Sequence, residues 1–414
     1  MAIIKGFKAI RPTRDKAYLV ASRSYLTYSE ETLREKLLNN PYTFLHIINP
    51  EYSLNTPLLE GVKKFEKVRD KYTDFLTEGT LVADKKECLY IYQQVKLGKT
   101  YTGIIAASAV DDYLNGVIKI HEQTISNREE MFTNYLHCTG FNAEPVLLTY
   151  PKVPAINKII ESYLIQRPEY EFTSTNKVLH NLWLVQDEKK IQQLQALFED
   201  VAHVYIADGH HRTASSALLC KSRRASTESL DSNGAYNYFM SFLIDDEQLS
   251  IFDFNRLLTD LNGNTVAQYI LGIRKSYKVT KLDNKRNPTH KDEICMYLDK
   301  SWYGLVALEG SFKASDTVEC LDPAILSKNI LQPLHGIKDI RNDKRIHFLD
   351  GQQGLEGLEH AVDSGKFRVA FALKPITVAQ LKSVADNNRI MPPKSTFIEP
   401  KLRSGLTIYK ISDD

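Results

Sequence analysis

An apolar run of strand length, residues 202–207, leads into the turn Asp208-Gly209-His210-His211-Arg212 and then into small residues at positions 213–217. The run has the length and composition of a buried β-strand. The small residues after the turn allow a helix to pack close to a sheet, which would make the turn rigid. This β-turn-α unit constrains the chain to a fold in which helices cover a sheet.

The residues before this unit alternate between strand and helix patterns. A strand at 117–120 precedes a helix whose start is marked by a capping box of Ser126 and Glu129 and whose end lies near Gly140. Further strands are predicted at residues 145–150, 182–185 and 238–244, and further helices at residues 158–166 and 189–198.

The first quarter of the chain mixes both kinds of element. Ser29 begins an amphipathic helix that residues 39–41 end. The apolar residues 42–48 predict a strand, and residues 58–78 a helix. A hairpin is predicted from residues 87–92 and 101–110.

A second alternating set follows Asn262 and predicts a separate α/β domain. It comprises helices at 265–277 and 291–299 and strands at 277–282 and 304–308. A helix begun by a capping box of Thr377 and Gln380 and a hairpin turning at Ser404 and Gly405 complete the chain.

With 414 residues, the chain is long enough for two or three domains. We expect a mixed α/β (α+β) protein divided into an N-terminal region at 1–115, a core at 116–262 and a C-terminal domain at 263–414. No evident internal repeat supports a repeat architecture.

The composition excludes several classes of protein. A net charge of +2 provides no broad field for binding nucleic acid or an anionic membrane. The sequence has neither an export signal nor an apolar stretch of about 18 residues. Its five cysteines are scattered and form no CxxC pair, which argues against disulfides and a zinc site. We therefore expect a cytoplasmic protein that acts on small molecules.

The turn at 208–212 is the strongest functional candidate. A helix N-terminus offers backbone N–H groups and a positive dipole end, and Gly209 lets a ligand approach the backbone. His and Arg side chains add donors for phosphate oxygens. The predicted phosphate-binding residues are Asp208, Gly209, His210, His211, Arg212 and Thr213. The structural alternative is that Asp208 only caps the helix and the histidines bind buried carbonyl groups, but so many polar groups in one turn favour function.

Glu122, beside His121, lies in another strand-to-helix junction. Its carboxylate could accept the proton of a substrate hydroxyl that attacks phosphorus. Taken alone, the dipeptide fits a solvated turn better. His121 and the nearby Arg128 are candidates for substrate binding.

Two further groups could bind anions. Asn255 and Arg256 suit a carboxylate or phosphate in the substrate, although an exposed ion pair of the arginine is equally consistent. Lys394, Ser395 and Thr396 offer an ammonium group and two hydroxyls to the donor, and fit the start of a strand equally well.

The chain resembles a family of uncharacterised prokaryotic proteins over nearly its whole length. The resemblance is carried by SRSYLTYSEE, NPYTFLHIINPE, VIKIHEQT, ADGHHR and MPPKST. The ADGHHR segment is also similar to the signature turn of the ParB and sulfiredoxin fold, most closely in free L-serine kinases. Where sulfiredoxin needs a cysteine this turn has His210, and neither the helix-turn-helix nor the basic charge of ParB proteins is evident.

The resemblance implies a kinase of free L-serine, making or consuming O-phospho-L-serine, with a ParB/sulfiredoxin-like core at 116–262. It makes Glu122 the base and assigns the donor phosphates to the turn, with His211 a second catalytic candidate. The donor would be ATP, ADP or pyrophosphate. Magnesium is expected on general grounds, and no ligand cluster identifies its site. A non-catalytic nucleotide or polyphosphate sensor and a phosphoserine phosphatase are the alternatives.

Overall fold

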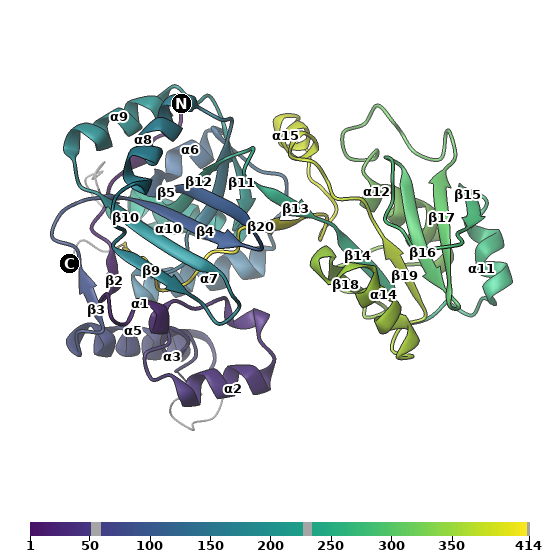
Figure 1. The fold of residues 1–414 in the computed structure, drawn as a ribbon, viewed down its shortest axis with the longest axis horizontal. Helices are drawn as coiled ribbons and strands as arrows, with labels where there is room; N and C mark the ends of the chain where they lie inside the picture. The colour runs from purple at the N-terminus through teal and green to yellow at the C-terminus, as the bar shows by residue number, and fades with distance from the viewer. Residues whose placement is uncertain (51–58, 227–233, 412–414) are drawn as a thin grey trace. The chain divides into compact units, whose positions relative to one another are not determined.

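The structure is a computed structural model that describes residues 1–50, 59–226 and 234–411 (Figure 1). The chain forms two compact units. Unit 1 comprises residues 1–119, 124–249 and 400–414, and unit 2 comprises residues 120–123 and 250–399. Each unit combines a β-sheet with helices, which confirms the predicted mixed α/β class.

Unit 1 is built on a nine-stranded mixed sheet. Adjacent strands are antiparallel except for two parallel pairs, β6 with β11 and β8 with β12. In sheet order the strands are β6 (Ile118–Lys119), β11 (Val204–Asp208), β8 (Val146–Tyr150), β12 (Tyr238–Asp245), β5 (Lys99–Ala109), β4 (Leu89–Lys96), β10 (Leu179–Val185) and β9 (Tyr170–Thr173), with β1 (Ile4–Lys5) paired to β5.

The main core of unit 1 lies between this sheet and its helices. Ile206 of β11 and Leu148 of β8 are fully buried with Phe198 and Cys220 from the helices. Helix α10 packs on α7, which packs on α5. The helices are α5 (Gly61–Thr77), α6 (Val110–Leu114), α7 (Ser126–Thr139), α8 (Pro154–Leu164), α9 (Glu188–Glu199) and α10 (His210–Ser226).

Smaller elements complete unit 1 around a second apolar cluster that includes Phe44, Tyr72 and Phe141. Short strands pair as β2 with β3 and as β7 with β21. These elements are β2 (Ile10–Pro12), α1 (Ala17–Val20), α2 (Glu30–Asn39), α3 (Leu45–Ile48), β3 (Leu81–Ala83), β7 (Phe141–Asn142) and β21 (Tyr409–Lys410).

Unit 2 is built on a six-stranded antiparallel sheet. Alternate residues along its strands are buried in two different cores. Met296, for example, lies in one core and Tyr297 in the other. In sheet order the strands are β15 (Tyr277–Lys281), β17 (Ser301–Ala307), β16 (Glu293–Leu298), β19 (Val369–Ala372), β14 (Phe254–Leu258) and β18 (Ile346–Asp350). The other elements are α11 (Val266–Ile273), α12 (Asp322–Leu326), α13 (Gln332–His335), α14 (Gly354–Asp363), α15 (Val378–Asp386) and the paired strands β13 (Ser250–Phe252) and β20 (Phe397–Glu399).

Most predicted elements are confirmed. Ser29 caps α2 by accepting the Thr32 N–H, and Thr377 and Gln380 form the predicted capping box of α15. The hairpin of β4 and β5 and the buried strand β11 also form as predicted. Position 58, where one predicted helix begins, lies outside the described residues. The three-part domain division stays a prediction.

Two predictions of element type are wrong. Residues 42–48 contain helix α3 in place of a strand, because a short apolar run does not distinguish the two by periodicity. Residues 291–299 contain strand β16 in place of a helix. Every residue of β16 is buried, since helices cover both faces of the sheet, and such a strand lacks the alternation of a half-buried one.

Two local predictions are also wrong. Ser126 is the first residue of α7 and makes no capping bond, whereas the Thr124 hydroxyl donates to Glu129. Ser404 bridges to Ser22 and β21 pairs with β7, so the chain around Gly405 joins earlier segments and does not form its own hairpin.

No helix within the described residues is both long and apolar enough to cross a membrane.

Gly103 in the middle of β5 is required for close strand packing. A Cβ atom at this position would collide with the Leu243 carbonyl oxygen and the Phe242 ring of β12. We predict that Gly103→Ala lowers the free energy of unfolding by about 1–3 kcal/mol through overpacking. Chemical denaturation measures this, with Thr100→Ala at an exposed end of the same strand as the control, expected to stay within about 0.5 kcal/mol. Equal effects of the two variants would contradict the packing argument.

Candidate anion-binding site

The strand-to-helix turn predicted from the sequence is formed by the end of β11 and the start of α10. Asp208 ends the strand, and His210 begins the helix. The Thr213 N–H donates to the Gly209 carbonyl at 3.0 Å, which closes the first helical turn. The N–H groups before it have no acceptor within the helix, as at every helix N-terminus.

Gly209 is needed here for two reasons. Its φ of +107° lies in a region that residues with a side chain rarely adopt. In addition, a Cβ atom would lie 3.1 Å from both Nε and one terminal nitrogen of Arg212. The missing side chain therefore lets the Arg212 guanidinium lie directly against the turn.

Arg212 is held by groups from two segments. Its Nη1 lies 2.8 Å from the Pro145 carbonyl oxygen and 2.5 Å from Oε1 of Glu144. Its Nη2 lies 3.7 Å from Oδ2 of Asp208. The side chain is still 26% exposed, so the guanidinium is positioned yet accessible. A fixed guanidinium is well suited to bind phosphate or carboxylate oxygens.

A second cation, Lys401, meets the same aspartate. Its ammonium nitrogen lies 3.4 Å from Oδ2 of Asp208, and the Gln94 amide fixes its backbone by donating to the Lys401 carbonyl at 3.1 Å. Burial favours the neutral acid, but Lys401, Arg212 and then His210 outweigh it and lower the pKa of Asp208. Asp208 is therefore ionised at neutral pH and gathers two cations at the turn.

The first turns of α10 are fixed against α7 through small side chains. The Ser215 hydroxyl lies 3.2 Å from the Glu129 carbonyl oxygen, and the Thr133 hydroxyl donates to the Ser215 carbonyl at 3.4 Å. Thr213 is completely buried and its hydroxyl lies 3.3 Å from the Gly209 carbonyl oxygen. His210 is 6% exposed and His211 is half-buried.

Unit 2 contains most of the other candidate residues. The Met391 N–H donates to the His121 carbonyl at 2.9 Å, which joins residues 120–123 to the segment that carries Lys394. His121 is 2% exposed, whereas Glu122 is half-buried. Arg128 is in unit 1, exposed on α7.

The remaining candidates of unit 2 are mostly engaged inside it. Asn255 accepts the Leu373 N–H at 2.9 Å, and Ser395 donates to the Pro392 carbonyl at 2.6 Å. Thr396 is half-buried. The Lys394 ammonium lies exposed, 5.3 Å from the centre of the Phe254 ring.

Arg256 is fully buried in β14. Its guanidinium donates to the Phe254 carbonyl at 2.5 Å and lies 4.7 Å from the centre of the Phe348 ring. Burial lowers its pKa to about 9, with Asp253 opposing the shift. The Arg256 side chain therefore packs within unit 2. The proposal that Arg256 binds substrate stays a prediction.

Sequence reasoning missed Lys401 and Glu144. Lys401 lies 193 residues after Asp208, in a segment whose predicted hairpin gave no hint of an ion pair. Glu144 carries no motif, and only the strand pairing of β8 with β11 brings it beside the turn. Within the described residues, no group of three or more His, Cys, Asp or Glu side chains is placed to hold a metal ion.

The chain belongs to the family described as "Protein of unknown function (DUF1015)", whose model matches residues 4–324. None of the curated proteins compared with the sequence matches it. Among solved structures, it is similar to a free serine kinase variant in complex with AMP, with 12% identity and a TM-score of 0.39 over 74% of this chain and 92% of that one.

Two further solved structures are similar. They are SbnI with a C-terminal truncation from Staphylococcus aureus (13% identity, TM-score 0.37, 71% of this chain and 82% of that one) and a conserved hypothetical protein from Pyrococcus furiosus (13% identity, TM-score 0.36, 75% and 98%). These scores are too low to establish a common fold, and the function proposed below rests on other grounds.

The ion pairs of Asp208 predict a pH-dependent contribution to stability. Because the folded pKa is lowered, the contribution is present above the unfolded value of about 4 and is lost as the pH falls through the folded pKa. We predict that Asp208→Asn costs about 0.5–1 kcal/mol at pH 7, a small amount because the side chain is 42% exposed. The difference from the unmodified protein should disappear in acid.

Denaturant unfolding at several pH values measures this difference. Asp200→Asn, at an exposed position of unit 1, is the matched control. A cost for Asp208→Asn that does not change with pH would contradict the ion-pair account.

Proposed function

We propose that this protein is a phosphotransferase that acts on the hydroxyl group of a free amino acid, with L-serine as the leading acceptor. The observation that carries the proposal is the convergence of Arg212 and Lys401 at the N-terminus of α10, directly after a buried strand. Two fixed cations and a helix N-terminus favour a polyphosphate over a neutral ligand. The resemblance of ADGHHR to the signature turn of free L-serine kinases supports the same reaction class.

In this proposal the turn holds the donor phosphates. Arg212 exchanges part of its contact with Glu144 and the Pro145 carbonyl for phosphate oxygens, and His210 and His211 add donors. The donor is ATP, ADP or pyrophosphate. The serine oxygen attacks the terminal phosphorus, the bond from that phosphorus to the rest of the donor breaks, and O-phospho-L-serine forms.

Glu122 is proposed as the base that accepts the hydroxyl proton. Glu122 lies upstream of the turn, in the segment HEQT. The resemblance to free L-serine kinases, in which a glutamate upstream of the signature turn is the base, supports this role.

In this proposal, magnesium is bound by the donor phosphates and not by the protein. The carboxylate of the turn, Asp208, already faces Lys401 and Arg212, so it is a poor ligand for a second kind of cation. The turn therefore does not fit a magnesium ion held by the protein.

The direct test is to incubate the purified protein with L-serine, magnesium and each of the three donors, and to measure phosphoserine. Formation of phosphoserine with at least one donor is expected. If phosphoserine is neither formed nor consumed under any of these conditions, the kinase is refuted. Release of inorganic phosphate from phosphoserine alone would indicate a phosphatase. Donor binding without turnover would indicate a sensor.

Replacing the proposed base should affect turnover and not donor binding. We predict that Glu122→Gln reduces kcat by about 10²- to 10⁴-fold, the usual contribution of a general base, and leaves donor affinity unchanged. Glu130→Gln, at an exposed glutamate of α7, is the control and should retain full activity. Full turnover by Glu122→Gln would rule out the base role.

Replacing the turn arginine should weaken donor binding. We predict that Arg212→Ala reduces donor affinity by about ten-fold or more, because a charge-assisted hydrogen bond to phosphate is lost. Arg224→Ala, in the last turn of the same helix, where the side chain pairs with Asp111, is the control. Calorimetric titration with the donor measures both, and equal affinities would argue against the proposed phosphate site.

A further inference from the structure

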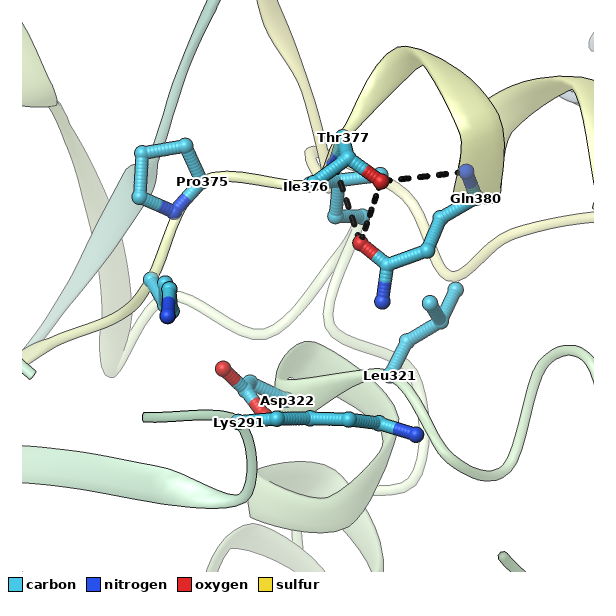
Figure 2. Close-up of a pocket in the computed structure, with 8 residues that line it drawn as sticks. Lys291, Leu321, Asp322, Pro375, Ile376, Thr377 and Gln380 are labelled. Carbon is cyan, nitrogen blue, oxygen red and sulfur yellow. Dashed lines mark hydrogen bonds between the residues drawn. The ribbon is translucent and has the colours of Figure 1, made fainter. Parts of the chain in front are cut away.

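Unit 2 contains a cavity of about 180 Å³ between the start of α15 and the start of α12 (Figure 2). Leu321 and Ile376 contribute buried apolar walls, and Lys291, Lys374 and Gln380 contribute polar groups. A cavity of about 150 Å³ accommodates benzene, so this one has room for a compact molecule of that size or slightly larger.

Asp322 is the buried polar group of this cavity. It is only 8% exposed, and its Oδ1 accepts the Asp292 N–H at 3.2 Å. Its other oxygen accepts no hydrogen bond from any residue in the described part of the chain, although the side chain lines the cavity. This oxygen is open to the cavity, where water or a ligand can complete its hydrogen bonding.

Two lysines border the same space. Lys374 donates to the Thr289 carbonyl at 3.2 Å, which fixes the ammonium group and leaves two of its N–H groups for a ligand. Lys291 is exposed at the rim, on the same side as Asp322 in Figure 2.

The nine-residue helix α15 closes the opposite side. Gln380 accepts the Thr377 N–H through Oε1 at 2.9 Å, and Figure 2 shows its amide nitrogen pointing away from Thr377 towards the side of Asp322 and Lys291. The N-terminal end of a helix favours negative charge. Two lysines, an amide donor and a helix N-terminus thus border one small cavity with apolar walls.

We infer that this cavity is a binding site for a small carboxylic acid, whose carboxylates contact Lys374, Lys291 and the Gln380 amide and whose carbon chain lies on Leu321 and Ile376. The site shares no residue with the turn at 208–212. Its ligand is compact, because the cavity has no room for a nucleotide.

Asp322 makes the site sensitive to pH. Burial raises its pKa to about 7, and the negative charge of Asp292 adds to the shift, whereas the hydrogen bond from the Asp292 N–H and the charges of Lys291 and Lys374 oppose it. The neighbouring Tyr277 stays neutral, because burial raises its pKa. Below pH 7 the protonated Asp322 no longer repels a carboxylate and can donate a hydrogen bond to it, so binding strengthens as the pH falls.

The test is calorimetric titration of the full-length protein with succinate, a compact dicarboxylate, at pH 6.5 and pH 8.5, with 1,4-butanediol as its neutral analogue. We expect succinate to bind, more tightly at pH 6.5, and butanediol not to bind. Lys374→Gln should weaken binding about ten-fold or more. Lys313→Gln, an exposed lysine of unit 2, and Arg212→Ala should leave it unchanged.

The pH dependence of succinate binding by Asp322→Asn distinguishes a direct role of Asp322 in binding from a purely structural role. This variant should bind succinate with the same affinity at both pH values. If Lys374→Gln unfolds, Lys291→Gln replaces it, with a smaller loss expected. Absence of succinate binding, unchanged affinity in the lysine variants, or loss of binding in Arg212→Ala would each overturn the inference.

Discussion

The turn between β11 and α10 depends on the contact between Gly209 and the Arg212 guanidinium. A side chain at position 209 would face both a disfavoured backbone angle and the arginine. With glycine there, Arg212 folds back over the turn and meets Glu144, Pro145 and Asp208. One residue without a side chain thereby allows a cation to be fixed at the end of a buried strand.

The surrounding fold makes that cation rigid. Strand β11 is buried on both faces, and small residues hold α10 close to α7. Lys401 comes from the C-terminal segment of the chain and completes the charge balance around Asp208. Fixed donors cost little reorganisation when a charged ligand binds, which is the property that phosphoryl transfer requires of a donor site.

The sequence was sufficient for features that depend on neighbouring residues. The buried strand 202–207, the glycine turn and the capped starts of α2 and α15 are local, and each is confirmed. Residues 42–48 and 291–299 were assigned to the wrong element type, because their apolar runs carry no periodicity that separates strand from helix.

The candidate site was predictable only in part, because some of its residues come together only in the tertiary structure. The turn is contiguous in sequence, whereas Lys401 and Glu144 reach it through strand pairing and the path of distant segments. The cavity beside Asp322 likewise combines residues 291, 322 and 374–380, none of which forms a motif. Long-range convergence of this kind depends on tertiary structure, which local patterns do not encode.

The central claim is that the turn at 208–212 binds the phosphates of a donor. A crystal structure of the full-length protein with a non-hydrolysable ATP analogue tests it most directly. The account predicts phosphate density at the N-terminus of α10, with Arg212 donating to phosphate oxygens. Density elsewhere, with Arg212 still bound only to Glu144, Asp208 and the Pro145 carbonyl, would contradict it.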